Sequence, residues 1–342
     1  MGSRAYALLP RLTGRRATAD DADRLTSRLL VTEGEHRNDK LSSFWVLILL
    51  SAVIATAGVI ADSTATVIGA MIVAPLMTPI LGTALAIVLS NRRLMVLNIL
   101  LVLLGAVSVI VIGYLLGLTT GIDLTAATNT QIAGRVSPRL IDLLAALATG
   151  VVGAFATVRS DISDTLPGVA IAISLVPPLA VVGLTLESGA TDQAVGALLL
   201  FMTNVSAIVA TGTLIFLAYG IRHAAAEAGI PVGHLHRSTI VTVVVGVALL
   251  AVPLGVGSTL VVQQEVVVSK ATPVATAWAE DRGWQVQSIT YAQKSLRIVA
   301  LGPPPSIDEK GLRQKLDEAG LEDVDARVTL VIGGSKELSA NP

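Results

Sequence analysis

Three polar residues lie inside or beside long apolar segments of this 342-residue chain, and they are the first candidates for chemistry. Asp62 and Asp161 each stand at one end of an apolar segment, and Asn204 lies in the middle of another. Acidic side chains within a membrane commonly couple transport to an ion or a proton, and a buried amide bonds a neighbouring helix or a solute. A second interpretation stays open for both aspartates, because Asp is also a favoured helix N-cap.

Two pairs of prolines interrupt apolar segments at matching depths. Pro75 and Pro79 lie in IVAPLMTPIL, and Pro177 and Pro178 lie in ISLVPPLA. Proline removes an amide donor, so carbonyls such as that of Pro75 lose their helical partners and must face protein, water or a solute. The side-chain hydroxyls at this depth are those of Thr78 and Ser174. We therefore expect a binding site at the paired breaks, unless the prolines only kink the bundle.

Patterns typical of enzymes, metal sites and nucleic-acid binding do not occur. The chain has no cysteine, which excludes thiolate ligands, cysteine nucleophiles and disulfides. His223, His234 and His236 share one loop but have no acidic partner at ligand spacing, and no nucleotide-binding or hydrolase motif is found. With 24 basic and 25 acidic residues, no global charge attracts nucleic acid. We expect a protein that is not an enzyme and has no cofactor, metal or nucleic-acid partner.

The composition predicts a lipid environment for the elements that carry these residues. Hydrophobic residues make up 53% of the chain and charged residues 14%, with a mean hydropathy of +0.73. Soluble domains carry about 25% charged residues. Seven charge-free runs reach or approach the length of a transmembrane helix. They are residues 41–61, 63–91, 94–122, 143–158, 165–186, 193–221 and 238–264. We predict an all-α polytopic membrane protein with about seven transmembrane helices.

The orientation follows from the basic residues near the helix ends. The first 43 residues hold eight Arg and Lys, which places this segment in the cytoplasm. Alternation of sides then leaves nearly all other short-loop basic residues inside as well, and the exceptions are Arg135 and Arg139. The seventh helix delivers the C-terminus to the outer face. The prediction is a multi-pass protein of the prokaryotic plasma (inner) membrane.

The chain matches itself at an offset of 99 residues. Between residues 53–85 and 152–184, 11 of 33 positions are identical, including Asp62/Asp161, Gly69/Gly168 and Pro79/Pro178. An odd number of crossings per copy inverts the second copy, as in many secondary transporters. We therefore predict two inverted three-helix repeats, at about 44–118 and about 143–219, whose middle helices are broken by proline. If the broken segments re-enter without crossing, the two copies are instead parallel.

The chain is predicted to contain four parts. Residues 1–43 form an Arg-rich cytoplasmic segment, and residues 44–264 form the membrane domain with a seventh helix at about 239–262. An extracytoplasmic α+β domain of order αββαβ follows at 265–334, before a tail at 335–342. Within the first part, Thr18 and Asp21 form a capping box before a short helix with Leu25 and Leu29 on one side. That helix lies on anionic headgroups or belongs to a solvated leader.

Several stretches resemble a known membrane family. The segments GAMIVAP and GVAIAISLVPP, in that order, with SPRLIDLLAALATGVVGAFA and ALLLFMTNVSAIVATGTLIF, are similar to the bacterial and archaeal family called domain of unknown function 389. The resemblance covers roughly residues 44 to 220. It implies a polytopic prokaryotic envelope protein and supplies no substrate, cofactor or catalytic residue.

These observations favour a transporter or pore for a small solute or ion, with its site at the paired broken helices. The expected partners are the lipid bilayer, the solute and further copies of the chain, because Gly113, Gly117 and Gly121 form a small-residue stripe suited to helix contact. The alternative is an envelope scaffold or sensor whose membrane part anchors and oligomerises the C-terminal domain.

Overall fold

The computed structural model describes residues 16–30, 37–159, 175–233, 266–281, 283–292, 295–302 and 309–332. The chain divides into two compact units, Met1–Gly255 and Val256–Pro342, and each is described by itself. Four predicted features lie outside the described residues: Asp161, Ser174, the helix expected at about 239–262 and the tail at 335–342.

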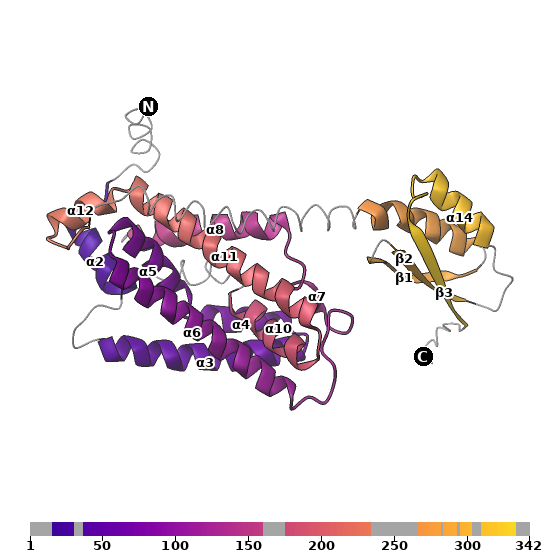
Figure 1. The fold of residues 1–342 in the computed structure, drawn as a ribbon, viewed down its shortest axis with the longest axis horizontal. Coiled ribbons are helices and arrows are strands. Elements are labelled where there is room, and N and C mark those ends of the chain that lie inside the picture. The colour runs from indigo at the N-terminus through magenta and orange to yellow at the C-terminus, as the bar shows by residue number, and fades with distance from the viewer. Residues whose placement is uncertain are drawn as a thin grey trace, which may run out of the picture. The chain divides into compact units, whose positions relative to one another are not determined.

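The described part of the first unit is helical (Figure 1). Its helices are α2 (Ala19–Leu29), α3 (Arg37–Ile60), α4 (Thr64–Val73), α5 (Met77–Val88), α6 (Arg92–Gly117), α7 (Thr130–Ala133), α8 (Leu140–Val158), α10 (Val176–Glu187), α11 (Thr191–Ala218) and α12 (Ile221–Glu227). The long helices α3, α6, α8 and α11 correspond to charge-free runs of the sequence.

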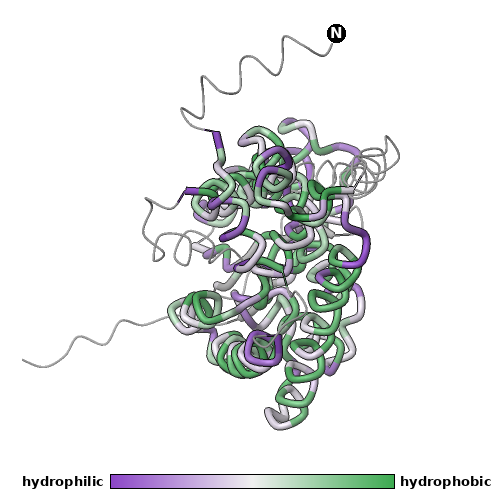
Figure 2. The backbone as a smooth tube through the Cα atoms, turned by 90° about the vertical axis from the view of Figure 1, so that its left-hand side faces the viewer, coloured by the Kyte–Doolittle hydropathy of each residue, from purple (hydrophilic) through white to green (hydrophobic). Residues whose placement is uncertain are grey.

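Within the described ranges, four helices are long and apolar enough to cross a membrane: α3, α6, α8 and α11. The pair α4 and α5 passes the same test but is bent by 47° at the break between them, which brings the total to as many as five spans. Outward-facing side chains on α3 and α6 are apolar, such as Leu50 (53% exposed) and Val107 (56% exposed). Figure 2 shows hydrophobic residues along the helices and hydrophilic ones mainly at helix ends and loops. Such surfaces are suited to lipid.

Two short helices lie at the centre of the first unit. Every residue of α5 except Thr78 is buried, and α10 is buried from Val176 to Thr185. Each of them packs against both α6 and α11. Pro79, Pro177 and Pro178 therefore lie in buried helices, and Pro75 lies just before one of them.

Glycine lets α10 approach α6 very closely. A Cβ atom on Gly183 would lie 2.6 Å from the backbone nitrogen of Tyr114 and 2.8 Å from the carbonyl carbon of Gly113. Both neighbours are backbone atoms, which no rotamer change can move. Small residues at such crossings increase the van der Waals contact that holds helices together in lipid.

Helix α2 is part of the folded unit. Its capping box is confirmed: the Thr18 hydroxyl accepts from the Asp21 amide, and the Asp21 carboxylate accepts from the Thr18 amide. Leu25 is buried, and the helix packs against α5, α8 and α12. The Arg24 guanidinium donates to the carbonyl of Val158 at 2.8 Å. The expectation of a solvated leader is wrong, because the apolar side of α2 packs on protein.

The second unit combines a three-stranded sheet with two helices. A helix over residues 266–280 is followed by β1 (Gln285–Ala292), β2 (Ser295–Gly302), α14 (Glu309–Glu318) and β3 (Asp325–Ile332). The strand order is β1-β2-β3, with β1 antiparallel and β3 parallel to the central β2. Trp278, Trp284, Ile298, Leu312 and Leu316 belong to a core that this unit forms alone.

Candidate functional site

The break between α4 and α5 is the main irregularity of the first unit. Helix α4 ends at Val73, and Pro75 follows directly after its C-cap residue Ala74. Because Pro75 has no amide hydrogen, it cannot continue the helical hydrogen bonds of α4. The carbonyl of Pro75, which loses its partner to Pro79, accepts instead from the Thr78 amide at 3.3 Å. Of the three expected partners of this carbonyl, protein, water or a solute, the structure shows a protein donor, the amide of its own tight turn.

The second proline pair has a different local role. Pro177 and Pro178 occupy the first positions of α10 and are buried. Proline is well tolerated there, because the first amides of a helix have no intrahelical partner. These two residues therefore start a helix in the described structure, and the preceding residues 160–174 lie outside it.

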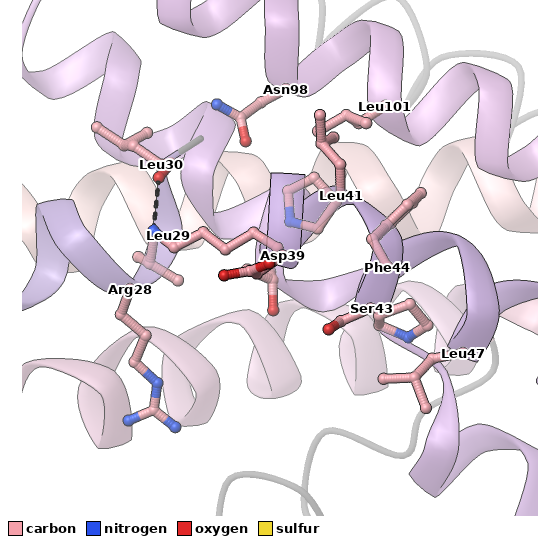
Figure 3. Close-up of a pocket in the computed structure, with 14 residues that line it drawn as sticks. Arg28, Leu29, Leu30, Asp39, Leu41, Ser43, Phe44, Leu47, Asn98 and Leu101 are labelled. Atoms are coloured by element: carbon pink, nitrogen blue, oxygen red, sulfur yellow. Dashed lines mark hydrogen bonds between the residues drawn. The ribbon is translucent and has the colours of Figure 1, made fainter. Parts of the chain in front are cut away.

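A cavity of about 340 Å³ adjoins the α4–α5 break. Pro75, Thr78 and Pro79 line it, so three of the predicted site residues meet at one space. The remaining walls come from the end of α2, the first turns of α3 and the first half of α6 (Figure 3). The lining does not include Pro177, Pro178 or Asn204.

The cavity contains a buried amide that the sequence reasoning missed. Asn98 on α6 is 1% exposed and lines the cavity, and its side-chain nitrogen donates to the carbonyl of Leu94 at 2.8 Å. Its side-chain oxygen receives no hydrogen bond from any described residue. A buried acceptor without a donor costs free energy, so such an atom is a marker for a bound water or solute. The sequence feature that could have identified Asn98 is the presence of an amide side chain within the apolar run 94–122.

Basic and acidic side chains from the start of α3 complete the polar part of the lining. The Lys40 ammonium donates to the carbonyl of Leu30 at 3.3 Å, shown as a dashed line in Figure 3, and also to that of Ser27. It thus compensates the negative end of the α2 dipole. Asp39 and Ser43 add a carboxylate and a hydroxyl to the lining.

Asp62 lies far from this cavity, in the turn after α3. It adopts a left-handed backbone conformation (φ +50°), which Asp tolerates better than most residues. The N-cap of α4 is Ser63 and not Asp62, since the Ser63 hydroxyl accepts from the Thr66 amide. Asp62 accepts from the Thr130 hydroxyl at 2.7 Å and the Gln131 amide at 3.0 Å. It therefore fastens the loop before α8 to the end of α3.

The bonds to Asp62 predict an acid-sensitive contact. The hydrogen bond from the Thr130 hydroxyl lowers the pKa of Asp62 below its ordinary value of 3.8. Desolvation opposes it as the next-largest effect, and the backbone amides of Gln131 and Thr130 lower the pKa further. A lowered folded-state pKa means that the contribution to stability is present above pH 3.8 and is lost as the pH falls through the folded value. We expect Asp62→Asn, which keeps an acceptor oxygen and tolerates the same backbone but lacks the charge, to unfold at a lower temperature than wild type at neutral pH.

The measurement is the melting temperature of both proteins between about pH 6 and about pH 3. Wild type should lose its advantage over Asp62→Asn as acid is added. A constant difference across this range would contradict the role of the ionised carboxylate.

The remaining predicted residues are distributed over the unit. Asn204 is 2% exposed on α11, and Asp161 and Ser174 lie outside the described residues. Across the described ranges, no group of three or more His, Asp or Glu side chains is arranged to hold a metal ion. The cavity at the α4–α5 break is therefore the candidate site that the structure supports best.

Helices long and apolar enough to span a membrane lie around a buried helix that follows a proline break. This arrangement is typical of helical membrane proteins, which hold irregular backbone inside the protein. Residues 71–210 match the family described as "Domain of unknown function (DUF389)". The resemblance drawn from the sequence motifs is thereby confirmed for this part of the chain, which includes the break and all of α6.

A curated relative is also similar to this chain. Over 176 residues the chain is 36% identical to the uncharacterized protein MJ0678 of Methanocaldococcus jannaschii. The aligned part is 52% of this chain and 54% of the relative, so the chain spans about half the length of the curated protein that it matches. No solved structure matches.

Proposed function

We propose that the first unit is a transporter or pore for a small solute or ion in the prokaryotic plasma membrane. The observation that carries the proposal is the cavity of about 340 Å³ at the α4–α5 break, with the side-chain oxygen of Asn98 buried in its wall. The buried side-chain oxygen of Asn98, to which no described residue donates, costs free energy unless water or a solute in the cavity supplies a donor. Broken helices at the centre of a membrane protein are typical of transporter binding sites.

The helix bounds support the 99-residue repeat. Helix α5 spans residues 77–88 and α10 spans 176–187, so both of their ends differ by 99. Helices α6 and α11 begin at Arg92 and Thr191, which also differ by 99. The turn between α5 and α6 is therefore as long as the turn between α10 and α11. Equal turn lengths are expected of two copies of one ancestral unit.

Individual contacts support a two-fold relation between the copies. Gly113 of α6 contacts Ala180 and Gly183 of α10. In the 99-residue register, Gly113 of the first copy corresponds to Gly212 of the second. Ala180 and Gly183 of the second copy correspond to Leu81 and Ala84 of the first. In α11, Gly212 contacts Leu81 and Ala84 of α5. The same contact is therefore found when the two copies exchange places. This is expected when a two-fold axis relates the copies.

The helix directions favour an inverted arrangement. Helices α5 and α6 are antiparallel, since Gly82 meets Asn98 and Leu76 meets Gly105. Helices α6 and α10 are parallel, since Gly113 meets Ala180 and Gly117 meets Glu187. It follows that α5 and its counterpart α10 run in opposite directions. The axis is then perpendicular to the helices, in the plane of the membrane, which supports inverted repeats over parallel ones.

A cysteine at the cavity tests the transport proposal. The chain has no cysteine of its own, so Thr78→Cys introduces a single thiol. If water fills the cavity, a small membrane-impermeant methanethiosulfonate reagent should modify this thiol in membrane vesicles. The matched control is Val107→Cys on the outward face of α6, which is 56% exposed in the structure but faces lipid in the proposed arrangement. Equal inertness of both thiols would contradict a hydrated site.

One observation supports the alternative function, an envelope scaffold or sensor. The C-terminal unit has its own hydrophobic core and folds as a compact body. A membrane anchor that oligomerises a sensory or scaffolding domain requires such an independent unit. An inert Thr78→Cys, together with oligomers that persist after purification, would favour this alternative.

A further inference from the structure

The end of helix α2 forms one wall of the cavity. Arg28, Leu29 and Leu30 line it, and both leucines are buried. The carbonyl oxygen of Leu29 lies 2.6 Å from the position that a Cβ atom on Gly82 of α5 would occupy. The end of α2 therefore packs tightly on α5 and covers the cavity from the side that the proposed orientation assigns to the cytoplasm.

Helix α2 also connects the two repeat copies. It packs on α5 of the first copy and on α8 of the second. The Arg24 guanidinium donates to the carbonyl of Val158, the last residue of α8. The Ala17 amide donates to the carbonyl of Tyr219 at the end of α11. Alternating access in inverted-repeat transporters moves one copy against the other, so a helix that ties the same end of both copies opposes this movement.

This helix has no counterpart in the second copy. In the 99-residue register, α2 corresponds to residues 118–128, which the structure describes and which contain no helix. The fold of one repeat copy therefore does not require such a helix. An element that occurs in one copy alone, on the wall of the candidate site, favours a regulatory role at that site.

The contact between α2 and the cavity wall brings two hydrogen-bond acceptors together. The side-chain oxygen of Asn98 lies 2.5 Å from the same Cβ position on Gly82 as the Leu29 carbonyl oxygen. No described residue donates to this Asn98 oxygen, and the opposite orientation of the amide would turn the oxygen toward the carbonyl of Leu94 instead. A buried acceptor that faces another acceptor is unfavourable. Withdrawal of α2 would remove this cost, because bulk water could then donate to Asn98.

The amide and the covering helix occur together. The residue equivalent to Asn98 in the second copy is Ala197, which is fully buried. The second copy thus has neither a polar side chain at this place nor a helix in the segment equivalent to α2. This agreement links the amide to the helix that covers it.

Few groups hold α2 in its position. The Lys40 ammonium of α3 donates to the carbonyls of Ser27 and Leu30 at the end of α2, and Figure 3 shows the second of these bonds. The apolar side of the helix is short and consists of Ala22, Leu25, Leu29 and Leu30. The opposite side is polar and exposed, as at Asp23. A helix with so small an apolar contact can separate from the bundle as a unit, at a lower free energy than global unfolding.

We infer that α2 is a cytoplasmic latch on the cavity. In the position that the structure shows, the helix closes the cavity toward the cytoplasm, and its withdrawal opens the cavity and exposes Asn98 to that side. This inference rests on the proposed function and specifies how access to the same site is regulated.

The first test measures how fast a membrane-impermeant methanethiosulfonate reagent modifies the Thr78→Cys thiol in inside-out vesicles, which present the cytoplasmic face. In this background, Lys40→Met removes the ammonium that holds α2 and should raise the rate about tenfold, the effect of losing one hydrogen bond from a charged group. Asn98→Ala removes the unsatisfied acceptor under α2 and should lower the rate about fivefold. The matched control is Asp23→Asn on the exposed side of α2, which should leave the rate unchanged. General loss of folding cannot produce changes of opposite sign.

Hydrogen–deuterium exchange of the same full-length proteins reports on α2 without reference to transport. The amides of α2 should exchange faster than those of α5 and α6, faster still in Lys40→Met and more slowly in Asn98→Ala, while exchange in α5 and α6 stays the same. If α2 exchanges no faster than α5, or if neither variant changes the thiol rate, the latch is wrong and the hydrated site remains. A Thr78→Cys thiol that reacts in none of these proteins would instead overturn the proposed function, and the inference with it.

Discussion

Replacement of Gly183 by alanine is expected to abolish stable folding of the membrane unit. The added Cβ atom would contact the Ile110 carbonyl oxygen, the Tyr114 backbone nitrogen and the Gly113 carbonyl carbon, all of them atoms of the α6 backbone. No side chain can rotate away, so α6 and α10 would have to separate. Overpacking of this kind costs about 1–3 kcal/mol or more. Helices in lipid depend on close packing, because lipid provides no hydrophobic driving force between them.

The measurement is the melting temperature and monodisperse yield of the detergent-purified protein. Gly69→Ala on α4 is the matched control, since no atom lies within 4 Å of the added Cβ, and it should melt at or slightly above the wild-type temperature. Gly212→Ala should be intermediate, because its added Cβ meets only side chains of Leu81 and Ala84. If Gly183→Ala melts like wild type, the close α6–α10 crossing is wrong, and the contact argument for two-fold symmetry is lost.

The long helices could be predicted because their signal is local. Charge-free runs of apolar residues must be helical in lipid, where every backbone group needs an internal partner. Accordingly α3, α6, α8 and α11 follow the predicted runs to within a few residues, apart from the early start of α3 at Arg37. The break at Pro75 was also predictable, since a missing amide hydrogen ends α4 whatever surrounds it.

The roles of individual polar residues were less predictable, because they depend on partners distant in sequence. Asp62 satisfies the N-cap pattern, yet it accepts from Thr130 and Gln131 in a loop almost 70 residues later. Asn98 lies close to Arg92 and Arg93, where an amide would be expected at the membrane surface. Its burial results from α2 and α5 folding over it, which no local pattern reports.

In the C-terminal unit, the strands could be predicted from the sequence but their order and pairing in the sheet could not. Alternation of apolar residues locates β1, β2 and β3, because it reflects burial on one face of each strand. The central position of β2 and its parallel pairing with β3 arise from α14, which carries the chain back across the sheet. That crossover is a property of tertiary packing.

A reporter that is active only in the cytoplasm should be silent when it is fused after Pro342. The described structure gathers several segments at one end of the first unit: the Ala17 amide donates to the Tyr219 carbonyl, and Arg222 donates to the Val88 carbonyl. The segments around α2, the end of α5 and α12 therefore lie at one end of the unit, and we propose that they share one side of the membrane. This side carries the basic residues Arg92 and Arg93, so the positive-inside rule assigns it to the cytoplasm.

The same reporter inserted into the loop at residues 228–233 should be active, because this loop follows α12 at the cytoplasmic end. The apolar run 238–264 separates the two reporter positions in the sequence, and we expect this run to cross the membrane once. Activity at both sites would mean that the run does not cross, and the C-terminal unit would then be cytoplasmic. Silence at both sites would instead reverse the whole orientation and place Arg92 and Arg93 outside. Only activity in the loop combined with silence after Pro342 agrees with seven crossings and an inverted pair of repeats.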